Sequence, residues 1–311
     1  MSLPATFGGA GWQPRAQSHA DELGSLWASH AVASEVAPLE AVLLAWPPDS
    51  LDFTGDPDRW LMLRRPHLTQ MRAEYRALVD RFESLGVAVH VCRPSLPQPP
   101  NSIFLRDLFL MTPEGAVLAR PAAAQRAGEE RGVAEALARL GVPLLASFRG
   151  QETFEGADAL WLRPDLVAVG TGLRTNQAAA ARLRGVLAEL GVDLVEVPMP
   201  ASGVQHLLGV VNLIDADLAA HRPAHGSPEL TGLLDDLGIA PLDLEESPES
   251  GTGGGMNFVT LAPRTILLPS QNPACRARYE AAGVEVHEAH ITEYLAAAGG
   301  LGCLTGILAR H

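Results

Sequence analysis

Apolar and polar positions repeat one local pattern five times along the chain. A helical stretch ends in glycine, and an apolar run of β type follows at once. Glycine accepts the left-handed backbone that closes a helix, so each glycine predicts a helix end and the start of a strand. The glycines lie 45 to 55 residues apart. The segments are FESLGVAVHVC (Gly86), LARLGVPLLAS (Gly141), LAELGVDLVEV (Gly191), LDDLGIAPLDL (Gly238) and YEAAGVEVHEA (Gly283).

A second pattern precedes four of those helices. Two short apolar runs are separated by Pro, Gly or Asp, which is typical of a β-hairpin. Each unit therefore reads as ββαβ. The four hairpin segments are FLMTPEGAVLA, ALWLRPDLVAVG, VVNLIDADLAA and FVTLAPRTILL.

The first unit is less regular than the others. It has one strand, AVLLAW, and a predicted helix at 68–85, and the last strand of the chain, 304–309, could complete its hairpin. A repeat unit cannot bury its apolar face alone, so five units in about 270 residues indicate closure around an axis. We expect one α/β domain at 36–311, preceded by an extension at 1–35. Two unrelated α/β domains are the alternative.

Composition limits the partners and the compartment. The 311-residue chain is 47% hydrophobic and carries a formal net charge of −13, which argues against sequence-independent nucleic-acid binding. There are three cysteines, no CxxC pair and no HExxH motif, so no zinc site and no disulfide framework are expected. The N-terminus has no signal-peptide pattern, and no apolar run is long enough to span a membrane. A cytoplasmic protein without membrane contact is expected, and a homo-oligomer is possible.

Polar residues stand at matching positions, just before the hairpin, in successive units. Equivalent positions in a closed repeat lie at one end of the axis, so these side chains should meet in one pocket. They are Asp107, Glu155, His206, Asn257 and, before the strand that would complete the first unit, Cys303.

The grouping suggests nucleophilic catalysis. A histidine beside Cys303 would stabilise the reactive thiolate. A carboxylate behind His206 would fix its tautomer and favour the imidazolium. A further carboxylate would bind a cationic group of the substrate. Taken singly, each residue also has an ordinary structural explanation; Asp107, for example, could form a surface ion pair with Arg106.

With these residues, the chain resembles the guanidino-group-modifying enzymes of the pentein superfamily, which include arginine deiminases, dimethylarginine dimethylaminohydrolases and amidinotransferases. The resemblance runs from about residue 40 to 309 and implies a five-bladed α/β propeller of ββαβ repeats with pseudo-fivefold symmetry. It rests on five motifs in order: NSIFLRD, FEGAD, GTGLRTN, QHLL and GGLGCLTG.

The resemblance also implies roles for particular residues. Cys303 would attack the guanidinium carbon, His206 would act as general acid and base, and Glu155 would orient His206. Asp107 would hold the guanidinium nitrogens. For the rest of the substrate, the matching positions are Arg126 and Arg174 for its carboxylate and Asn101 for its amino-acid end. No metal or organic cofactor is implied.

One position bears on the subfamily. Arginine deiminases and amidinotransferases carry an aspartate two residues after the histidine, where this chain has Leu208, and dimethylarginine hydrolases also lack that aspartate. NSIFLRD, by contrast, reads more like the deiminase motif. We expect a hydrolase that acts on arginine or an Nω-substituted arginine, with methylated arginine favoured and citrulline as another possible substrate. An amidinotransferase and a non-catalytic binding propeller are the alternatives.

Overall fold

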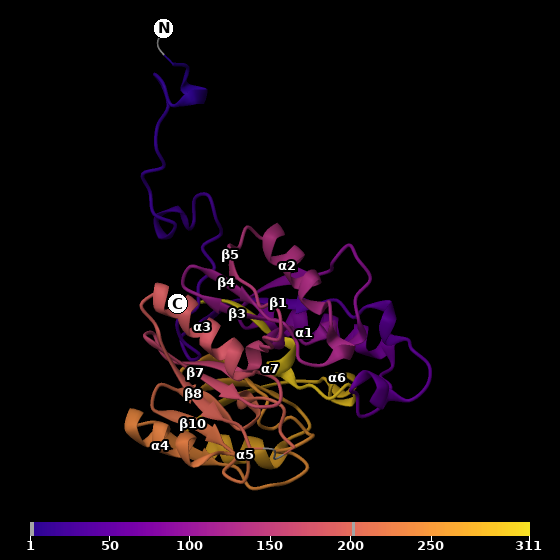
Figure 1. Ribbon diagram of the computed structural model, residues 1–311. Helices are drawn as coiled ribbons and strands as arrows, with labels where there is room; N and C mark the ends of the chain where they lie inside the picture. Colours follow the sequence, from indigo (N-terminus) through magenta and orange to yellow (C-terminus); the bar gives the residue numbers. More distant parts are fainter. Residues whose placement is uncertain (1–2, 201–202) are drawn as a thin grey trace.

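The computed structural model describes residues 3–200 and 203–311, and in it the predicted repeat forms five three-stranded sheets arranged as blades (Figure 1). In each blade the middle strand pairs antiparallel with one neighbour and parallel with the other, and a helix leads from the middle strand to the parallel one. The five-bladed α/β propeller is confirmed.

Blades two to five follow chain order. Blade two is β3 (Phe109–Thr112), β4 (Gly115–Leu118), α2 (Glu129–Arg139) and β5 (Leu144–Ala146). Blade three is β6 (Ala159–Arg163), β7 (Leu166–Thr171), α3 (Gln177–Glu189) and β8 (Asp193–Pro198). Blade four is β9 (Val211–Asp215), β10 (Leu218–His221), α4 (Pro228–Leu237) and β11 (Ala240–Asp243). Blade five is β12 (Val259–Ala262), β13 (Thr265–Pro269), α5 (Pro273–Ala281) and β14 (Glu285–Ala289).

The first blade joins the two ends of the domain, as predicted. Its strands are β1 (Leu39–Ala45), β2 (Ala88–Cys92) and the last strand of the chain, β15 (Gly306–Arg310), and its helix is α1 (Leu68–Ser84). β15 pairs antiparallel with β1. It starts two residues later than expected because residues 301–304 form a helical turn, α7 (Leu301–Leu304). A further short helix, α6 (Thr292–Ala296), precedes it.

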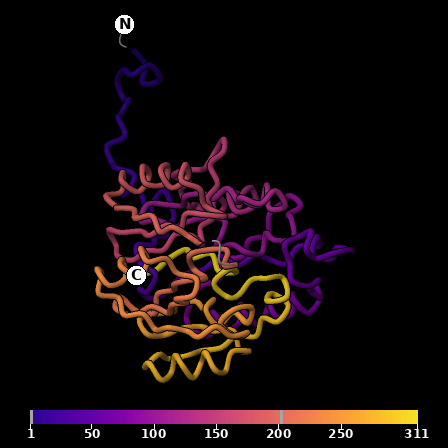
Figure 2. Tube along the Cα trace, turned by 60° about the horizontal axis from the view of Figure 1, so that its bottom comes forward, coloured from indigo at the N-terminus to yellow at the C-terminus, as the bar shows by residue number. Residues whose placement is uncertain are grey.

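Burial explains why the units close into a ring. Strands β3 and β15 are buried at every position, whereas the outer strands β2 and β14 are exposed or half-buried at every residue except the last. In Figure 2 the coiled traces of the helices lie at the margins of the molecule. α1 turns one apolar stripe inward: Met71, Tyr75, Leu78 and Phe82.

All five glycines at the helix ends adopt the left-handed backbone that the pattern requires, with φ between 69° and 79°. The repeat could therefore be predicted from the sequence, because every blade needs a left-handed glycine at the end of its helix.

The N-terminal segment projects away from the blades in both views (Figures 1 and 2). Its later residues touch the body, since Ala28 and Val32 donate backbone hydrogen bonds to Gly141 and Thr112. The domain boundary at residue 36 stays a prediction. Across residues 3–200 and 203–311, no helix is both long and apolar enough to cross a membrane.

Candidate active site

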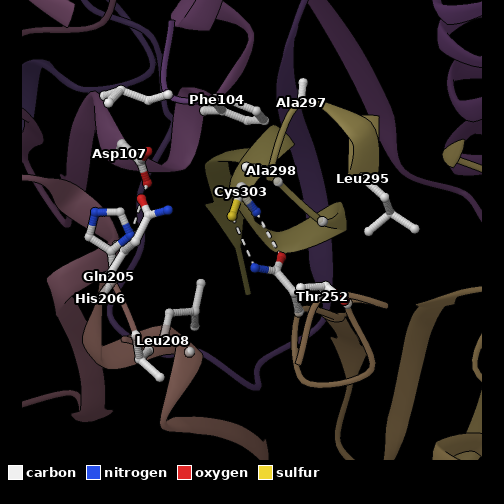
Figure 3. A pocket seen from close by; sticks show the side chains of 18 of the residues that line it. Phe104, Asp107, Gln205, His206, Leu208, Thr252, Leu295, Ala297, Ala298 and Cys303 are labelled. Carbon is white, nitrogen blue, oxygen red and sulfur yellow. Dashed lines mark hydrogen bonds and ion pairs between the residues drawn. The ribbon is translucent and has the colours of Figure 1, made fainter. Parts of the chain in front are cut away.

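Six of the seven residues expected at the site line one cavity of about 380 Å³ (Figure 3). The seventh, Glu155, lies behind His206 and is completely buried. The six are Asn101, Asp107, Arg126, Arg174, His206 and Cys303. The structure thus brings the residues together, and their catalytic and binding roles remain predictions.

Short helical turns before the innermost strands position these side chains at the cavity. Asp107 ends the turn Leu105–Asp107 before β3. Glu155 and His206 each precede such a turn, Gly156–Asp158 before β6 and Leu207–Gly209 before β9. Cys303 belongs to α7, before β15. Because each blade repeats this turn, residues far apart in the chain reach the same end of the axis.

The turn after Glu155 explains the glycine of FEGAD. A Cβ on Gly156 would lie 2.4 Å from the carbonyl oxygen of Phe109 and 2.5 Å from that of Arg106, so only glycine allows this close approach. Asp158 closes the same turn and accepts a hydrogen bond at 3.0 Å from the backbone N–H of Leu207. Leu207 follows His206 directly, so Asp158 fixes the backbone that carries the imidazole.

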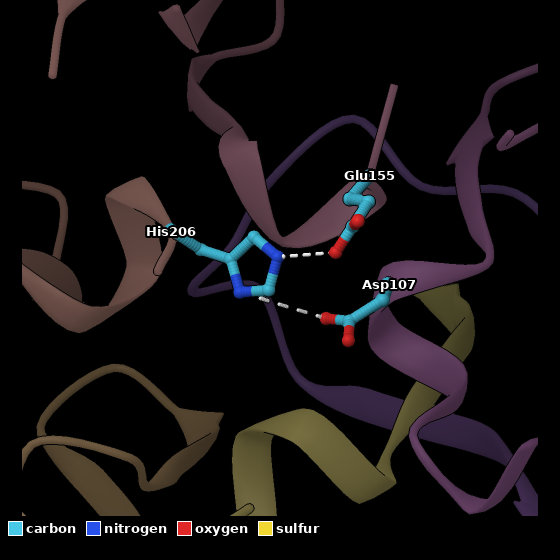
Figure 4. Close-up of side chains that lie close together, drawn as sticks. All are labelled: Asp107, Glu155 and His206. Carbon is cyan, nitrogen blue, oxygen red and sulfur yellow. Dashed lines mark hydrogen bonds and ion pairs between the residues drawn. The ribbon is translucent and has the colours of Figure 1, made fainter. Parts of the chain in front are cut away.

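His206 is held between two carboxylates (Figure 4). Its Nε2–H donates to Glu155 Oε2 at 2.6 Å, and its Nδ1 lies 3.9 Å from Asp107 Oδ1. Burial lowers the pKa of His206, but the two carboxylates outweigh burial and raise that pKa to about 9. The imidazole is therefore a cation at neutral pH, with a proton on Nδ1 facing Asp107.

Arg126 serves as the counter-ion of the carboxylates. It donates to Asp107 at 2.6 Å, to Glu155 at 3.3 Å, and twice to Glu129, at 3.0 and 2.8 Å. The sequence reasoning assigned Arg126 only to the substrate's carboxylate and missed Glu129. The one available signal was the spacing of Glu129, three residues after Arg126 in the same segment. Burial raises the pKa of Glu129 to about 7 against the opposing charge of Arg126.

One carboxylate oxygen each of Asp107 and Glu155 and one ring nitrogen of His206 lie within 4.8 Å of one another, close enough to hold a cation. The Arg126 guanidinium already contacts both carboxylates. A metal ion would therefore have to displace Arg126.

Cys303 lies on the opposite wall of the cavity, in a frame of glycines. Asn257 brackets it: Asn257 Nδ2 donates to Sγ at 2.9 Å, and the N–H of Cys303 donates to Asn257 Oδ1 at 3.0 Å. A Cβ on Gly300 or Gly302 would come within 2.7 Å of Asn257. These two glycines thus let Asn257 reach the thiol, which explains the GGLGC motif.

The surroundings of Cys303 favour the neutral thiol. Burial raises its pKa to about 11, the Asp107 charge adds to the rise, and the Asn257 hydrogen bond opposes it. Deprotonation therefore requires a new positive charge beside the sulfur.

Arg174 approaches the cluster from the cavity rim. Its Nη1 donates to Glu155 Oε1 at 3.3 Å, and its Nη2 donates to Gln205 Oε1 at 2.7 Å. Asn101 donates from Nδ2 to the Trp60 carbonyl at 2.6 Å. Within the described residues, Asn101 Oδ1 and Asp107 Oδ1 have no hydrogen-bond partner although both are buried. Two acceptor atoms at the cavity are thus free for a ligand.

Sequence comparison finds similar proteins among arginine deiminases and dimethylarginine dimethylaminohydrolases. Residues 88–224 match the arginine deiminase family. An N(G),N(G)-dimethylarginine dimethylaminohydrolase of Streptomyces coelicolor is 32% identical over 176 residues, which cover 54% of this chain and 63% of that enzyme. The enzyme of the same name from Pseudomonas aeruginosa is 24% identical over 78% of this chain and 90% of its own length.

Solved structures extend the likeness to the whole fold. The Pseudomonas aeruginosa dimethylarginine dimethylaminohydrolase, solved with citrulline, has a TM-score of 0.71 at 19% identity, over 88% of this chain and all of that one. The amidinotransferase SxtG of Microseira wollei has a TM-score of 0.74 at 15% identity, over 91% of this chain and 98% of that one.

The chain has the fold of the pentein enzymes, and its sequence is similar to members of the pentein superfamily. It has the five blades expected of that fold and brings the thiol, the imidazole and the Asp107 carboxylate to one cavity. At Leu208 it departs from the histidine-x-aspartate pattern noted above, and this side chain forms part of the cavity wall.

Proposed function

We propose that this protein hydrolyses the guanidino group of arginine or of an Nω-substituted arginine through a covalent intermediate on Cys303. The observation that carries the proposal is the shared cavity of Cys303 and a protonated His206 that Glu155 and Asp107 hold in place. A nucleophile and a proton donor facing one space are what substitution at a guanidinium carbon requires.

The free acceptor atoms define how the substrate binds. Asp107 Oδ2 is engaged by Arg126, so Oδ1 is available to accept an N–H of the guanidinium. At the other end of the substrate, Asn101 Oδ1 can accept from the α-ammonium group. Arg174 is the better placed arginine for the α-carboxylate, because Arg126 already makes four hydrogen bonds to protein carboxylates.

The bound guanidinium activates the nucleophile. Its positive charge beside the sulfur lowers the pKa of the Cys303 thiol, whose proton then leaves to solvent. The thiolate attacks the guanidinium carbon, and a C–S bond forms. His206 donates its proton to the leaving nitrogen as the C–N bond breaks, which releases ammonia or an alkylamine.

Water completes the reaction. The neutral His206 takes a proton from a water molecule, and the resulting hydroxide attacks the amidino carbon. Collapse of the tetrahedral adduct breaks the C–S bond, the hydroxyl proton of the adduct passes to the departing sulfur, and the Cys303 thiol and the ureido product, citrulline, are released. His206 is protonated again, as it was at the start.

Leu208 supports a preference for methylated substrates. Its side chain is 4% exposed and meets the cavity two residues after His206. A carboxylate there would accept hydrogen bonds from the terminal nitrogens of unsubstituted arginine, whereas an apolar wall accommodates N-methyl groups and leaves no buried acceptor unpaired.

The test is a substrate panel scored by mass spectrometry: arginine, monomethylarginine, dimethylarginine, agmatine and citrulline, each with and without ornithine or glycine. The proposal predicts citrulline with an amine or ammonia, and the highest rate for a methylated arginine. A new guanidino product formed only with the added amine would instead identify an amidinotransferase. No turnover of any of the guanidines would contradict the proposal.

A further inference from the structure

A second cavity, of about 560 Å³, lies outside the site described above. It is bounded by α1, the end of β2, the loop that follows β2, and the first turn of α2. It shares no lining residue with the cavity of Cys303. The residues that matter here are Trp46, Arg72, Arg93, Gln98 and Glu129.

The mouth of this cavity is positively charged, although the chain as a whole carries a net charge of −13. The guanidinium carbons of Arg72 and Arg93 lie 5.3 and 5.5 Å from the centre of the Trp46 ring. Arg72 is paired with Asp49. Arg93 is exposed, and within residues 3–200 and 203–311 it has no carboxylate within ion-pair distance. It is thus a cation held against an aromatic face with its N–H donors free for an anion.

The floor of the cavity carries a carboxyl group. Glu129 is fully buried, its Oε2 accepts both hydrogen bonds from Arg126, and its Oε1 has no partner among the described residues. Gln98 Oε1, also on this cavity, is buried without a partner as well. An unpaired buried acceptor costs free energy that a bound N–H group would offset.

We propose that this cavity is a second binding site for a free amino acid. The ligand's carboxylate binds Arg93 at the mouth, and its ammonium or other cationic N–H group reaches Glu129 Oε1 at the floor. A zwitterion is favoured because one end of the cavity offers a cation and the other a carboxyl group. A simple anion would leave Glu129 unpaired, and a simple cation would face the arginines.

The site is adjacent to the catalytic carboxylates without being part of them. Glu129 contacts Arg126, and Arg126 contacts Asp107 and Glu155. Three side chains, Glu129, Arg126 and Glu155, therefore separate a ligand on Glu129 from the imidazole of His206.

The experiment is a calorimetric titration of the full-length Cys303→Ser protein with L-arginine. Two binding events are expected. Arg93→Gln should weaken one of them by roughly tenfold or more, since it removes a charge-assisted hydrogen bond. Asp107→Asn should weaken the other event. Agmatine, which lacks the carboxylate, should lose the event that depends on Arg93.

Arg76→Gln is the matched control. Arg76 lies 5.3 Å from the same indole ring but does not line the cavity, so both events should survive its replacement. In the protein with Cys303 intact, Arg93→Gln should leave kcat/KM unchanged, which shows that the variant is folded.

Three results would overturn the second site. One is a single binding event that Asp107→Asn removes, an outcome that leaves the proposed function intact. Another is equal weakening by Arg76→Gln and Arg93→Gln, which would indicate attraction to surface charge. The third is propionate competing as well as arginine for the event that depends on Arg93.

Discussion

The two walls of the catalytic cavity carry their reactive groups in different ways. On one wall, His206 is fixed by Glu155 and Asp107, which Arg126 and Glu129 hold in turn. On the other wall, the side chain of Asn257 donates to Cys303 within a glycine frame that allows the close contact. His206 on the charged wall stays protonated at neutral pH, whereas the Cys303 thiol on the other wall stays neutral until a cation binds beside it. The difference shows how one pocket can hold a proton donor and a nucleophile side by side, each in the protonation state that it needs before the substrate binds.

The largest effects should come from removing either reactive group. Cys303→Ser and His206→Ala should each lower kcat by more than roughly 10³-fold, because losing a covalent nucleophile or its proton donor typically has effects of this size. Thermal unfolding monitored by circular dichroism should show that both variants fold. Turnover within about tenfold of the wild type in a folded variant would remove the mechanism.

Glu155→Gln should come next, with a fall in kcat of about 10²-fold or more, because general acid–base catalysis contributes about that much. Catalysis requires a protonated His206, so the wild-type rate should fall as pH rises through about 9, the pKa of His206. With one neighbouring carboxylate removed, that fall should begin at a lower pH. If the rate of Glu155→Gln fell at the same alkaline pH as the wild-type rate, Glu155 would not control the pKa of His206.

The protonation of His206 also makes the stability of the folded protein depend on pH. The pKa of His206 is raised from 6.5 to about 9 in the folded state, so its contribution to stability is full below pH 6.5 and is lost as pH rises through about 9. The urea midpoint of the wild type should therefore drop over that interval more than the midpoint of His206→Ala does. Parallel curves for the two proteins would contradict the assignment.

Arg174→Gln tests the recognition of the α-carboxylate. For substrates with that carboxylate, kcat/KM should fall about 10- to 100-fold, as expected when a charged hydrogen-bond partner is lost. Any activity on agmatine, which lacks the carboxylate, should be nearly unaffected. If agmatine proved the best substrate of the wild type, the role of Arg174 in carboxylate binding would be wrong.

Leu208→Asp, in the turn that follows His206, should give the smallest effect and would add a further carboxylate to the cavity. A second carboxylate should raise the ratio of kcat/KM for arginine to that for dimethylarginine by about tenfold, the size expected from one charged hydrogen bond. Leu208→Met, which keeps the wall apolar, is the matched control and should leave the ratio unchanged. Equal ratios for Asp and Met would show that this position does not select the substrate.

The features that the sequence made predictable are those that recur in every blade. The left-handed glycines, the hairpins and the polar residue before each hairpin are local and periodic, so five copies reinforce one another. The pairing of β1 with β15 was predictable because one unit lacked a strand. The residue roles carried over from the superfamily still await the tests above.

Other features depend on side-chain packing between blades, which no period in the sequence records. Glu129 lies only three residues after Arg126, but this pair concerns the site because the same guanidinium also reaches Asp107 and Glu155 from other turns. Asn257 was recognised at a repeat position, but its two hydrogen bonds to Cys303 depend on Gly300 and Gly302, which lie 43 and 45 residues away in the chain. The second cavity likewise needs α1 and α2 side by side with the loop after β2.

The most direct test of the central claim is to trap the intermediate. Wild-type protein mixed with arginine or monomethylarginine is quenched in acid within milliseconds to seconds, digested and analysed by mass spectrometry. The account predicts an adduct on the peptide that contains Cys303, with the mass of the substrate less the departing amine, and no adduct in Cys303→Ser. Steady turnover with no adduct at any time, or an adduct on another residue that persists in Cys303→Ser, would contradict it.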